Sequence, residues 1–219
     1  WLVPTVNGAW YSDKSPLLFW LIAGGWEIVG VHTWVARVET LIVALGMLLT
    51  LRRLAARLGM DARGAETAMW LLAGCVGFTV FSTTIMFDLL LSLTALGALH
   101  ALLDLDASRW KRGIVLLGVT IGLGLLAKGP VMLLHIVAVA VLAPLWSDTA
   151  RARKTRWYFA LLAGLLIGVA ILLCWLLPAA WYAGPDYWQP LVDKVTGRIA
   201  HSFAHNRPWW WYLPLLPVL

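Results

Sequence analysis

Four polar stretches inside a mostly apolar chain carry the side chains that could do chemistry. They are Asp13-Lys14 near the start, Asp88, Lys128, and a basic and aromatic segment at 197–212. A lysine ammonium group is a compact point charge that suits phosphate, and a neighbouring carboxylate can orient it or exchange a proton. The residue types therefore indicate binding of an anion, with Lys14 as the first candidate.

Each of the first three stretches also has a purely structural explanation. Asp13-Lys14 could be a solvated turn, and Lys128 could be an anchor whose ammonium group reaches the membrane surface. Asp88 falls about one turn inside a predicted span, where a carboxylate costs up to about 2.5–3.5 kcal/mol on insertion scales. We therefore expect Asp88 to face an aqueous cavity or to form a buried ion pair with Arg37 or Lys128.

The fourth stretch combines cations with an aromatic belt. The run Trp209-Trp210-Trp211-Tyr212 is typical of re-entry into a membrane. The basic and imidazole side chains that precede it are Arg198, His201, His205 and Arg207. They could form a second anion clamp that closes on the outer cavity, or they could simply decorate the interface. The two histidines suit one helical face, but the Glu of a metalloprotease helix is missing, so no metal site is assigned.

The composition indicates an integral membrane protein. Of 219 residues, 61% are apolar and 13% are charged, whereas soluble domains are roughly 45–50% apolar and about 25% charged. The net charge of +6 would suggest nucleic acid as the partner of a soluble protein. Here the basic residues lie between apolar runs and act as topology signals, so no nucleic acid partner is expected. Cys75 and Cys174 lie singly in apolar runs and give neither a metal spacing nor a disulfide framework.

Other phosphate chemistries lack their motifs. The sequence contains no glycine-rich phosphate loop, no nucleophile elbow and no CxxC pair. The sequence therefore argues against soluble nucleotide chemistry. Cations that gather beside lipid on one side of a membrane suit a lipid-linked phosphate best.

The apolar pattern predicts an all-α, polytopic helix bundle. Residues 1–33 are expected to form an outer loop and a short interfacial helix at 16–30, and residues 34–178 the transmembrane bundle. The expected spans are 34–57, 64–82, 85–105, 112–128, 129–146 and 157–178. An outer loop at 179–209 then leads to a further span that starts within 210–219, which makes about six to seven spans. Because the chain opens at Trp1 and ends in a short apolar run, we expect a fragment.

The charges predict the orientation of this bundle. Eleven of the 17 Lys and Arg residues lie in three connections, each separated from the next by two predicted spans. These residues are Arg52, Arg53, Arg57, Arg63, Arg109, Lys111, Arg112, Arg151, Arg153, Lys154 and Arg156. Basic connections stay in the cytoplasm, so residues 1–33 and 179–209 are expected on the opposite side. A full span at 16–30 would reverse this order, which favours the interfacial helix.

Five motifs, in order along the chain, resemble those of the polyprenyl-phosphate-dependent glycosyltransferases with the GT-C fold. The resemblance is to the bacterial aminoarabinose (lipid A) transferase and protein O-mannosyltransferase superfamily. The motifs are Asp13-Lys14-Ser15-Pro16 after Trp1-Leu2-Val3-Pro4, Trp34-Val35-Ala36-Arg37, Met86-Phe87-Asp88, Leu126-Ala127-Lys128-Gly129-Pro130, and His205-Asn206-Arg207-Pro208-Trp209-Trp210-Trp211-Tyr212. Each motif alone is weakly specific, but five in the same order are fairly specific.

The resemblance implies an enzyme that transfers a sugar from a polyprenyl (undecaprenyl) phosphate donor to an acceptor, with inversion. The acceptor would be lipid A or another envelope glycolipid, with protein as the alternative, at the periplasmic face of a bacterial inner membrane. The general base would be an Asp upstream of Trp1, so this fragment alone is expected to be inactive. The family often has Glu where this chain has Asp13. A divalent metal is the one cofactor that the resemblance leaves open.

The resemblance also assigns roles to individual residues. Lys14, Asp13 and Asp88 are the expected catalytic residues. The expected ligands of the donor phosphate are Lys14, Lys128, Arg198 and Arg207. The expected lining of the substrate cavity is Tyr11, Arg37, His201, His205 and Trp209. Two alternatives of other classes remain open, namely a carrier or flippase of lipid-linked sugars and a non-catalytic membrane subunit.

Overall fold

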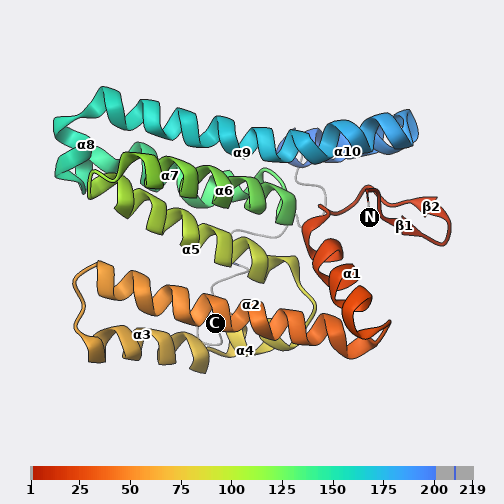
Figure 1. Ribbon diagram of the computed structural model, residues 1–219, viewed down its shortest axis with the longest axis horizontal. Helices are drawn as coiled ribbons and strands as arrows, with labels where there is room; N and C mark the ends of the chain where they lie inside the picture. Colours follow the sequence, from red (N-terminus) through yellow and green to blue (C-terminus); the bar gives the residue numbers. More distant parts are fainter. Residues whose placement is uncertain (1, 201–209, 211–219) are drawn as a thin grey trace.

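The structure, a computed structural model, describes residues 2–200 and residue 210 of the chain. Four long helices run side by side, as Figure 1 shows: α2 (Thr33–Arg57), α5 (Phe87–Asp106), α6 (Trp110–Lys128) and α9 (Lys154–Ala183). Within the described residues, these four helices are each long and apolar enough to cross a membrane. The prediction of an all-α, polytopic membrane bundle is therefore confirmed.

Helix α6 is the centre of the bundle. In its most apolar stretch 61% of the residues are buried, against 22% in α9. The main core joins leucines of α5 and α6 to α9 residues such as Trp157, whose indole N–H donates to the carbonyl of Ala140 at 3.0 Å. On the other side of α9, Leu162, Leu166 and Leu177 are exposed, as suits side chains that face lipid tails.

Small residues let α6 and α9 approach closely. A Cβ placed on Gly118 would lie 2.5 Å from Ile167, and one placed on Gly168 would lie 2.6 Å from Cγ2 of Ile121. The same Gly168 position is 3.1 Å from the backbone nitrogen of Gly122. Membrane helices associate through such contacts because water-driven burial contributes little between them in lipid.

The predicted span at 64–82 is broken. Helix α3 (Ala62–Gly74) and helix α4 (Val76–Thr83) together run back alongside α2, but they are bent by 65° at Cys75. Cys75 is extended, with φ −70° and ψ 126°, and the hydroxyl of Thr79 donates to the carbonyl of Ala73 at 3.3 Å across the break. The bend makes this segment a broken span or a re-entrant loop instead of one straight helix.

The predicted span at 129–146 is shorter than expected. Helix α7 (Val131–Val141) has 11 residues and is followed by a 3₁₀ turn, Ala143–Leu145, and by the short helix α8 (Asp148–Ala152). A straight crossing needs about 20 residues, so this segment does not reach that length. Helix α9 differs in the other direction, because it is 30 residues long and extends beyond the predicted 157–178 at both ends.

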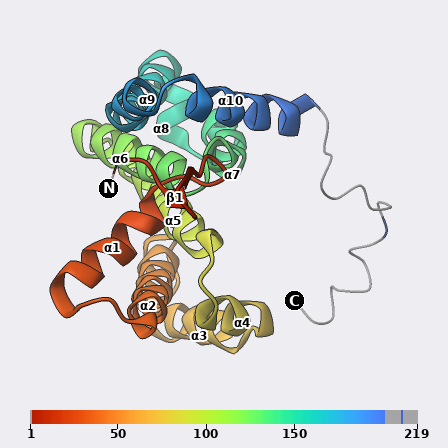
Figure 2. The same ribbon diagram turned by 90° about the vertical axis from the view of Figure 1, so that its right-hand side faces the viewer.

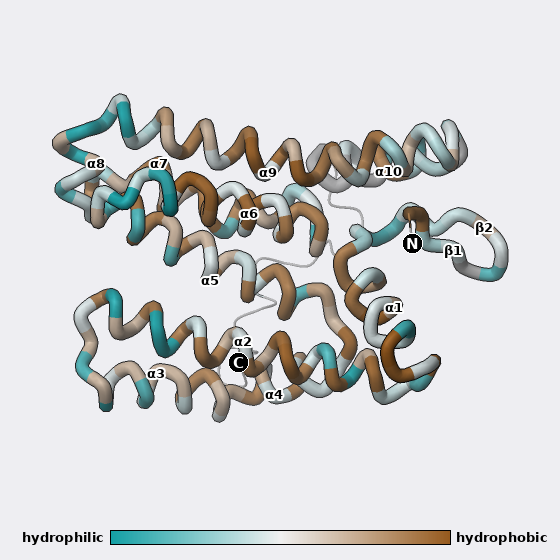
Figure 3. Tube along the Cα trace, in the orientation of Figure 1, coloured by the Kyte–Doolittle hydropathy of each residue, from teal (hydrophilic) through white to brown (hydrophobic). Residues whose placement is uncertain are grey.

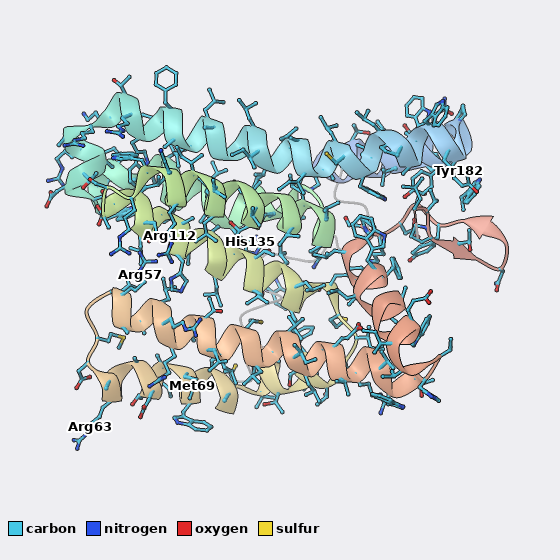
Figure 4. All side chains as sticks on the ribbon, viewed as in Figure 1. Arg57, Arg63, Met69, Arg112, His135 and Tyr182 are labelled. Carbon is cyan, nitrogen blue, oxygen red and sulfur yellow. The ribbon has the colours of Figure 1, made fainter. Side chains whose placement is uncertain are left out.

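The three basic connections lie at one end of the bundle. Hydrophilic residues concentrate there in Figure 3, and Figure 4 places Arg57, Arg63 and Arg112 at that end. The clustering expected from the charge pattern is therefore present in three dimensions. The cytoplasmic placement of this end stays a prediction.

The opposite end carries a hairpin and two further helices. Strands β1 (Thr5–Val6) and β2 (Ala9–Trp10) pair antiparallel around Asn7 and Gly8, whose φ angles are 52° and 81°. Asn-Gly favours this two-residue turn because both positions need positive φ. The expected outer loop over residues 1–14 thus contains a hairpin that was not predicted.

Helix α1 (Leu17–Val29) crosses the same end at a steep angle to the long helices (Figures 1 and 2). Its 13 residues are too few to span a bilayer, and this orientation suits the interfacial helix predicted at 16–30. Helix α10 (Pro185–Ala200) continues outward from α9, so the segment 179–209 is partly helical and not only a loop.

We expect Gly168→Ala to destabilise the protein, because the new methyl group would overlap Ile121 and approach the backbone of α6. Overpacking of this kind costs roughly 1–3 kcal/mol. The measurement is the thermal unfolding midpoint of the full-length protein in detergent. Gly74→Ala is the matched control, because no heavy atom lies within 4 Å of the added carbon there. Equal midpoints for the two variants would contradict the close packing of α6 against α9.

Candidate functional site

The loop that carries Asp13 and Lys14 is fixed at both ends. On one side the backbone N–H of Tyr11 donates to the carbonyl of Pro4 at 2.9 Å and closes the base of the hairpin. On the other side Pro16 is buried and begins α1 as its N-cap residue. A proline suits the start of a helix because its missing N–H has no helical partner there. The chain therefore holds the Asp-Lys pair in a short, defined turn.

The start of the chain is also attached to α9 and α10. The indole N–H of Trp175 donates to the carbonyl of Leu2 at 2.9 Å, and the ring of Trp175 packs edge-on against Trp20 at 6.3 Å. Tyr187 is fully buried in the same cluster. Burial raises the pKa of its phenol, so this side chain stays neutral. These contacts join α1, α9 and α10 beside the site.

Aromatic rings place Lys14 over the start of α5. Tyr11, Phe19 and Phe87 form a chain of edge-to-face contacts, with ring centroids 6.2 and 5.6 Å apart. The ammonium nitrogen of Lys14 lies 5.7 Å from the centroid of Phe87, a cation–π distance. Lys14 itself is exposed. No carboxylate of the described residues forms an ion pair with it.

The second charged pair joins α5 to α6. Nζ of Lys128 donates to Oδ1 of Asp88, and both side chains are partly exposed, at 36% and 44%. Asp88 lies in the first turn of α5 and Lys128 is the last residue of α6. Each charge is therefore opposite in sign to the partial charge of its helix end and is stabilised by it. Gly129 then turns the chain with φ 70°, a left-handed conformation that side chains disfavour. Asp88 therefore pairs with Lys128, one of the two partners proposed from the sequence.

These groups surround a cavity of about 240 Å³, which we call the polar cavity. Its lining comes from the Asp-Lys loop, the start of α5, the turn between α6 and α7, and one α10 residue. The lining residues are Ser12, Asp13, Lys14, Ser15, Met86, Phe87, Asp88, Ala127, Lys128, Gly129, Pro130, Val131 and Leu191. The fold thus brings together two carboxylates and two ammonium groups from three separate parts of the chain.

A larger cavity of about 820 Å³, the apolar cavity, lies beside it. It is lined by the hairpin, α1, the start of α2 and the start of α5. The lining residues are Val3, Pro4, Thr5, Tyr11, Lys14, Phe19, Trp20, Ile22, Ala23, Trp26, Thr33, Ala36, Ile85 and Phe87. Lys14 and Phe87 line both cavities. The ammonium group of Lys14 therefore stands where a polar space meets an apolar one.

The predicted site residues divide into three groups. Asp13, Lys14, Asp88 and Lys128 meet in the polar cavity, and Tyr11 lines the apolar one. Arg37 is exposed and lines neither cavity, so the structure does not support its place in the site. The remaining predicted residues, His201, His205, Arg207, Trp209 and the side chain of Arg198, lie outside what the structure describes.

Sequence reasoning missed the aromatic support of Lys14. Phe19 and Phe87 carry no chemistry of their own and appeared only inside longer motifs. Ser12, which is buried, and Ser15 also line the polar cavity without having been singled out. Within the described residues, no three His, Cys, Asp or Glu side chains are grouped as metal ligands. The arrangement can bind an anion at Lys14 and a hydrogen-bonding group near Asp13 and the serines.

The fold and the site define a polytopic membrane bundle in which a cavity lined by charged side chains lies beside an apolar one. Comparison with known sequences makes this class specific. The sequence profile described as dolichyl-phosphate-mannose-protein mannosyltransferase matches residues 13–175. The chain therefore belongs to this family of glycosyltransferases, as the motifs in the sequence indicated.

Individual relatives are similar over the whole chain. It is 32% identical over 225 residues to the undecaprenyl phosphate-alpha-4-amino-4-deoxy-L-arabinose arabinosyl transferase of Pseudomonas aeruginosa, covering 100% of this chain and 40% of that protein. The enzyme of the same description from Pseudomonas savastanoi pv. phaseolicola is 28% identical over 224 residues, covering 99% of this chain and 40% of that protein. The chain thus spans 40% of the length of these relatives.

Solved structures show the same fold. The crystal structure of ArnT from Cupriavidus metallidurans bound to undecaprenyl phosphate matches with a TM-score of 0.81 and 20% identity, covering 100% of this chain and 40% of that chain. Its apo state matches with a TM-score of 0.70 and 22% identity over the same shares. At 20% and 22% identity, this likeness shows that the fold is shared.

We expect the Asp88–Lys128 pair to contribute to stability as a unit. Lys128→Gln should lower the unfolding midpoint of the full-length protein, because it leaves the Asp88 carboxylate without its cation. The double variant Asp88→Asn/Lys128→Gln should recover part of the loss, with a coupling energy of about 0.5–3 kcal/mol. Lys14→Gln is the matched control, since Lys14 has no ion-pair partner among the described residues. Strictly additive losses in the double variant would contradict the coupling.

Proposed function

We propose that the full-length protein transfers a sugar from an undecaprenyl-phosphate donor to an acceptor on the periplasmic face of a bacterial inner membrane. The acceptor we favour is lipid A, or another glycolipid of the cell envelope. One observation carries the proposal: Lys14 lies between the polar cavity and the apolar cavity. A polyprenyl-phosphate sugar has its phosphate between a polar sugar and an apolar tail, which is the same order.

The cavities fit the two halves of such a donor. The apolar cavity, walled by aromatic residues of α1 and by the starts of α2 and α5, offers room for the first isoprenoid units. The polar cavity supplies carboxylates and hydroxyl groups that hydrogen-bond a sugar. The bound undecaprenyl phosphate of the related Cupriavidus structure supports this choice of lipid.

Lys14 has the electrostatic role in this proposal. As the bond from the sugar to the phosphate breaks, the leaving phosphate gains negative charge. A fixed ammonium group at that point stabilises the transition state more than the ground state. Because no carboxylate among the described residues pairs with Lys14, its charge is available to the phosphate. Arg198 and Arg207, proposed from the sequence, would add further positive charge.

The two carboxylates have different roles. Asp88 pairs with Lys128. Lys128 therefore holds the Asp88 carboxylate in position in the polar cavity. Asp13 lies next to Lys14 and lines the same cavity, where it can accept hydrogen bonds from the sugar. We expect the general base, which takes the proton of the acceptor hydroxyl, to be an Asp upstream of Trp1, as the family resemblance implies. Activity is therefore tested on the full-length protein.

A protein acceptor is the second candidate. The matching family is described as a protein mannosyltransferase, whereas the individual relatives are described as aminoarabinose transferases. We favour the second description because whole-chain similarity is more specific than a family profile. A carrier that moves lipid-linked sugars would use the same cavities without cleaving the donor.

We expect Lys14→Ala to reduce turnover by about 10²-fold, the usual scale for loss of one group that stabilises developing charge. The measurement is release of free polyprenyl phosphate from radiolabelled donor by the purified full-length protein. Lys111→Ala, at the opposite end of the bundle, is the control and should retain wild-type turnover. Near-normal turnover of Lys14→Ala would remove Lys14 from the mechanism.

The destination of the labelled sugar distinguishes the proposed acceptors. With membrane extract as acceptor source, we expect label in the lipid A fraction and release of stoichiometric polyprenyl phosphate. Label in protein would instead support O-glycosylation. Donor binding without release, for every acceptor fraction, would support the carrier.

A further inference from the structure

A second charged cluster lies at the basic end of the bundle, away from the two cavities. The carboxylate of Asp104 is fully buried in the last turn of α5. It accepts from Nη2 of Arg57 at 2.7 Å and lies 3.0 Å from Nε of Arg112. Nη1 of Arg109 is 3.9 Å from the same carboxylate. Three guanidinium groups, from the end of α2 and the start of α6, thus converge on one carboxylate.

The cluster contains more positive than negative charge. One carboxylate neutralises one guanidinium group, and the side chains of Arg109 and Arg112 are 61% and 66% exposed. The other acidic residues of this end are engaged elsewhere: Asp106 accepts from Ser147, Glu66 pairs with Arg52, and Asp148 pairs with Arg151. Asp61 accepts from the N–H of Gly64. Three guanidinium groups of the described residues therefore share the one carboxylate of Asp104, and Arg109 and Arg112 are the two more exposed of them.

The buried carboxylate fixes the geometry of these cations. Arg57 also donates to the carbonyl of His100 at 3.0 Å, and the ring of His100 lies 3.1 Å from the carbonyl of Thr50. These contacts fix Arg57 at the interface between α2 and α5. A flexible lysine on the surface would lack such contacts. Arginine forks suit phosphate because two parallel N–H groups match two phosphate oxygens. Helix α6 starts in the same place without a capping side chain, so its first N–H groups add to the positive potential.

We propose that Arg109 and Arg112, ordered by Asp104, bind the phosphate of an anionic phospholipid at the inner surface of the membrane. Arg109 precedes α6 and Arg112 lies in its first turn, next to the end of α5. Figure 4 shows Arg112 at the end of the bundle that carries the basic connections, where the headgroups of lipids are expected. Basic sites between helices on the cytoplasmic side are suited to cardiolipin and similar headgroups. This inference is independent of the proposed glycosyl transfer, which takes place at the other end of the bundle.

The test measures cardiolipin bound to the full-length protein in detergent by native mass spectrometry, with phosphatidylcholine as the neutral lipid. Arg109→Gln/Arg112→Gln should weaken cardiolipin binding by about tenfold or more, because it removes both outward guanidinium groups. The matched control is Lys111→Gln/Arg153→Gln, which removes the same charge from exposed residues of the same end. It should bind within about twofold of wild type, as expected for charges that are not ordered around a buried carboxylate.

Loss of Arg112 could unfold the inner end, so a milder variant is included. Arg109→Gln alone leaves the two closer partners of Asp104 in place, and it should still weaken cardiolipin binding relative to Lys111→Gln. Its unfolding midpoint should equal that of wild type, which separates lipid binding from folding.

Two results would overturn the proposal. Equal losses in the cluster variant and its matched control would show that the attraction comes from the general charge of the surface. Displacement of cardiolipin by an equimolar amount of inorganic phosphate would show a site for free anions and not for a lipid. Unchanged glycosyl transfer in Arg109→Gln, together with weaker lipid binding, is the expected pattern for a site separate from the catalytic end.

Discussion

The low polarity of the membrane interior decides where this chain can place charge. An ionisable group in hydrocarbon is costly unless it is paired or reaches water, so the long helices keep most of their charges at their ends. The result is two charged regions separated by the length of the bundle. One contains the Asp104 cluster between α2, α5 and α6, and the other contains the polar cavity around Lys14. The apolar packing of α6 against α9 matters because it fixes the positions of the two helices along the bundle and so keeps the two charged regions at opposite ends.

In the polar cavity, the two lysines differ in their surroundings. Lys128 is the last residue of α6 and forms an ion pair with Asp88. Lys14 comes from a loop, lies against the ring of Phe87, and borders both cavities. An aromatic face attracts a cation without neutralising it. Phe87 therefore positions the Lys14 ammonium group and leaves its charge free for a ligand, which a carboxylate in the same place would not do.

The sequence predicted the fold class, the four long spans and the four charged members of the polar cavity, for identifiable reasons. Long apolar runs and alternating basic connections are direct consequences of the bilayer, so they can be read without a structure. The break at Cys75 was not predicted this way, because residues 67–83 contain neither a charge nor a proline that would mark a bend. The hairpin at Asn7-Gly8 had a local signal that was overlooked. The place of Arg37 in the site stays a prediction, because a charge inside an apolar run does not reveal which way its side chain points, and Arg37 lines neither cavity.

Pairing in the polar cavity also explains how the Asp88 carboxylate is compatible with the proposed phosphate site at Lys14. An ionised carboxylate close to a phosphate repels it, by roughly 3 kcal/mol at about 5 Å with an effective dielectric constant of 20. Lys128 cancels most of that repulsion at Asp88, because its ammonium group is in direct contact with the carboxylate. Asp13 and Lys14 are then the charged residues of the same cavity that lie outside this pair. The turn at Gly129, with its left-handed φ, is what allows α6 to end with Lys128 facing Asp88 just before the chain reverses into α7. The anion site therefore depends on a backbone conformation in a part of the chain that is remote in sequence from Lys14.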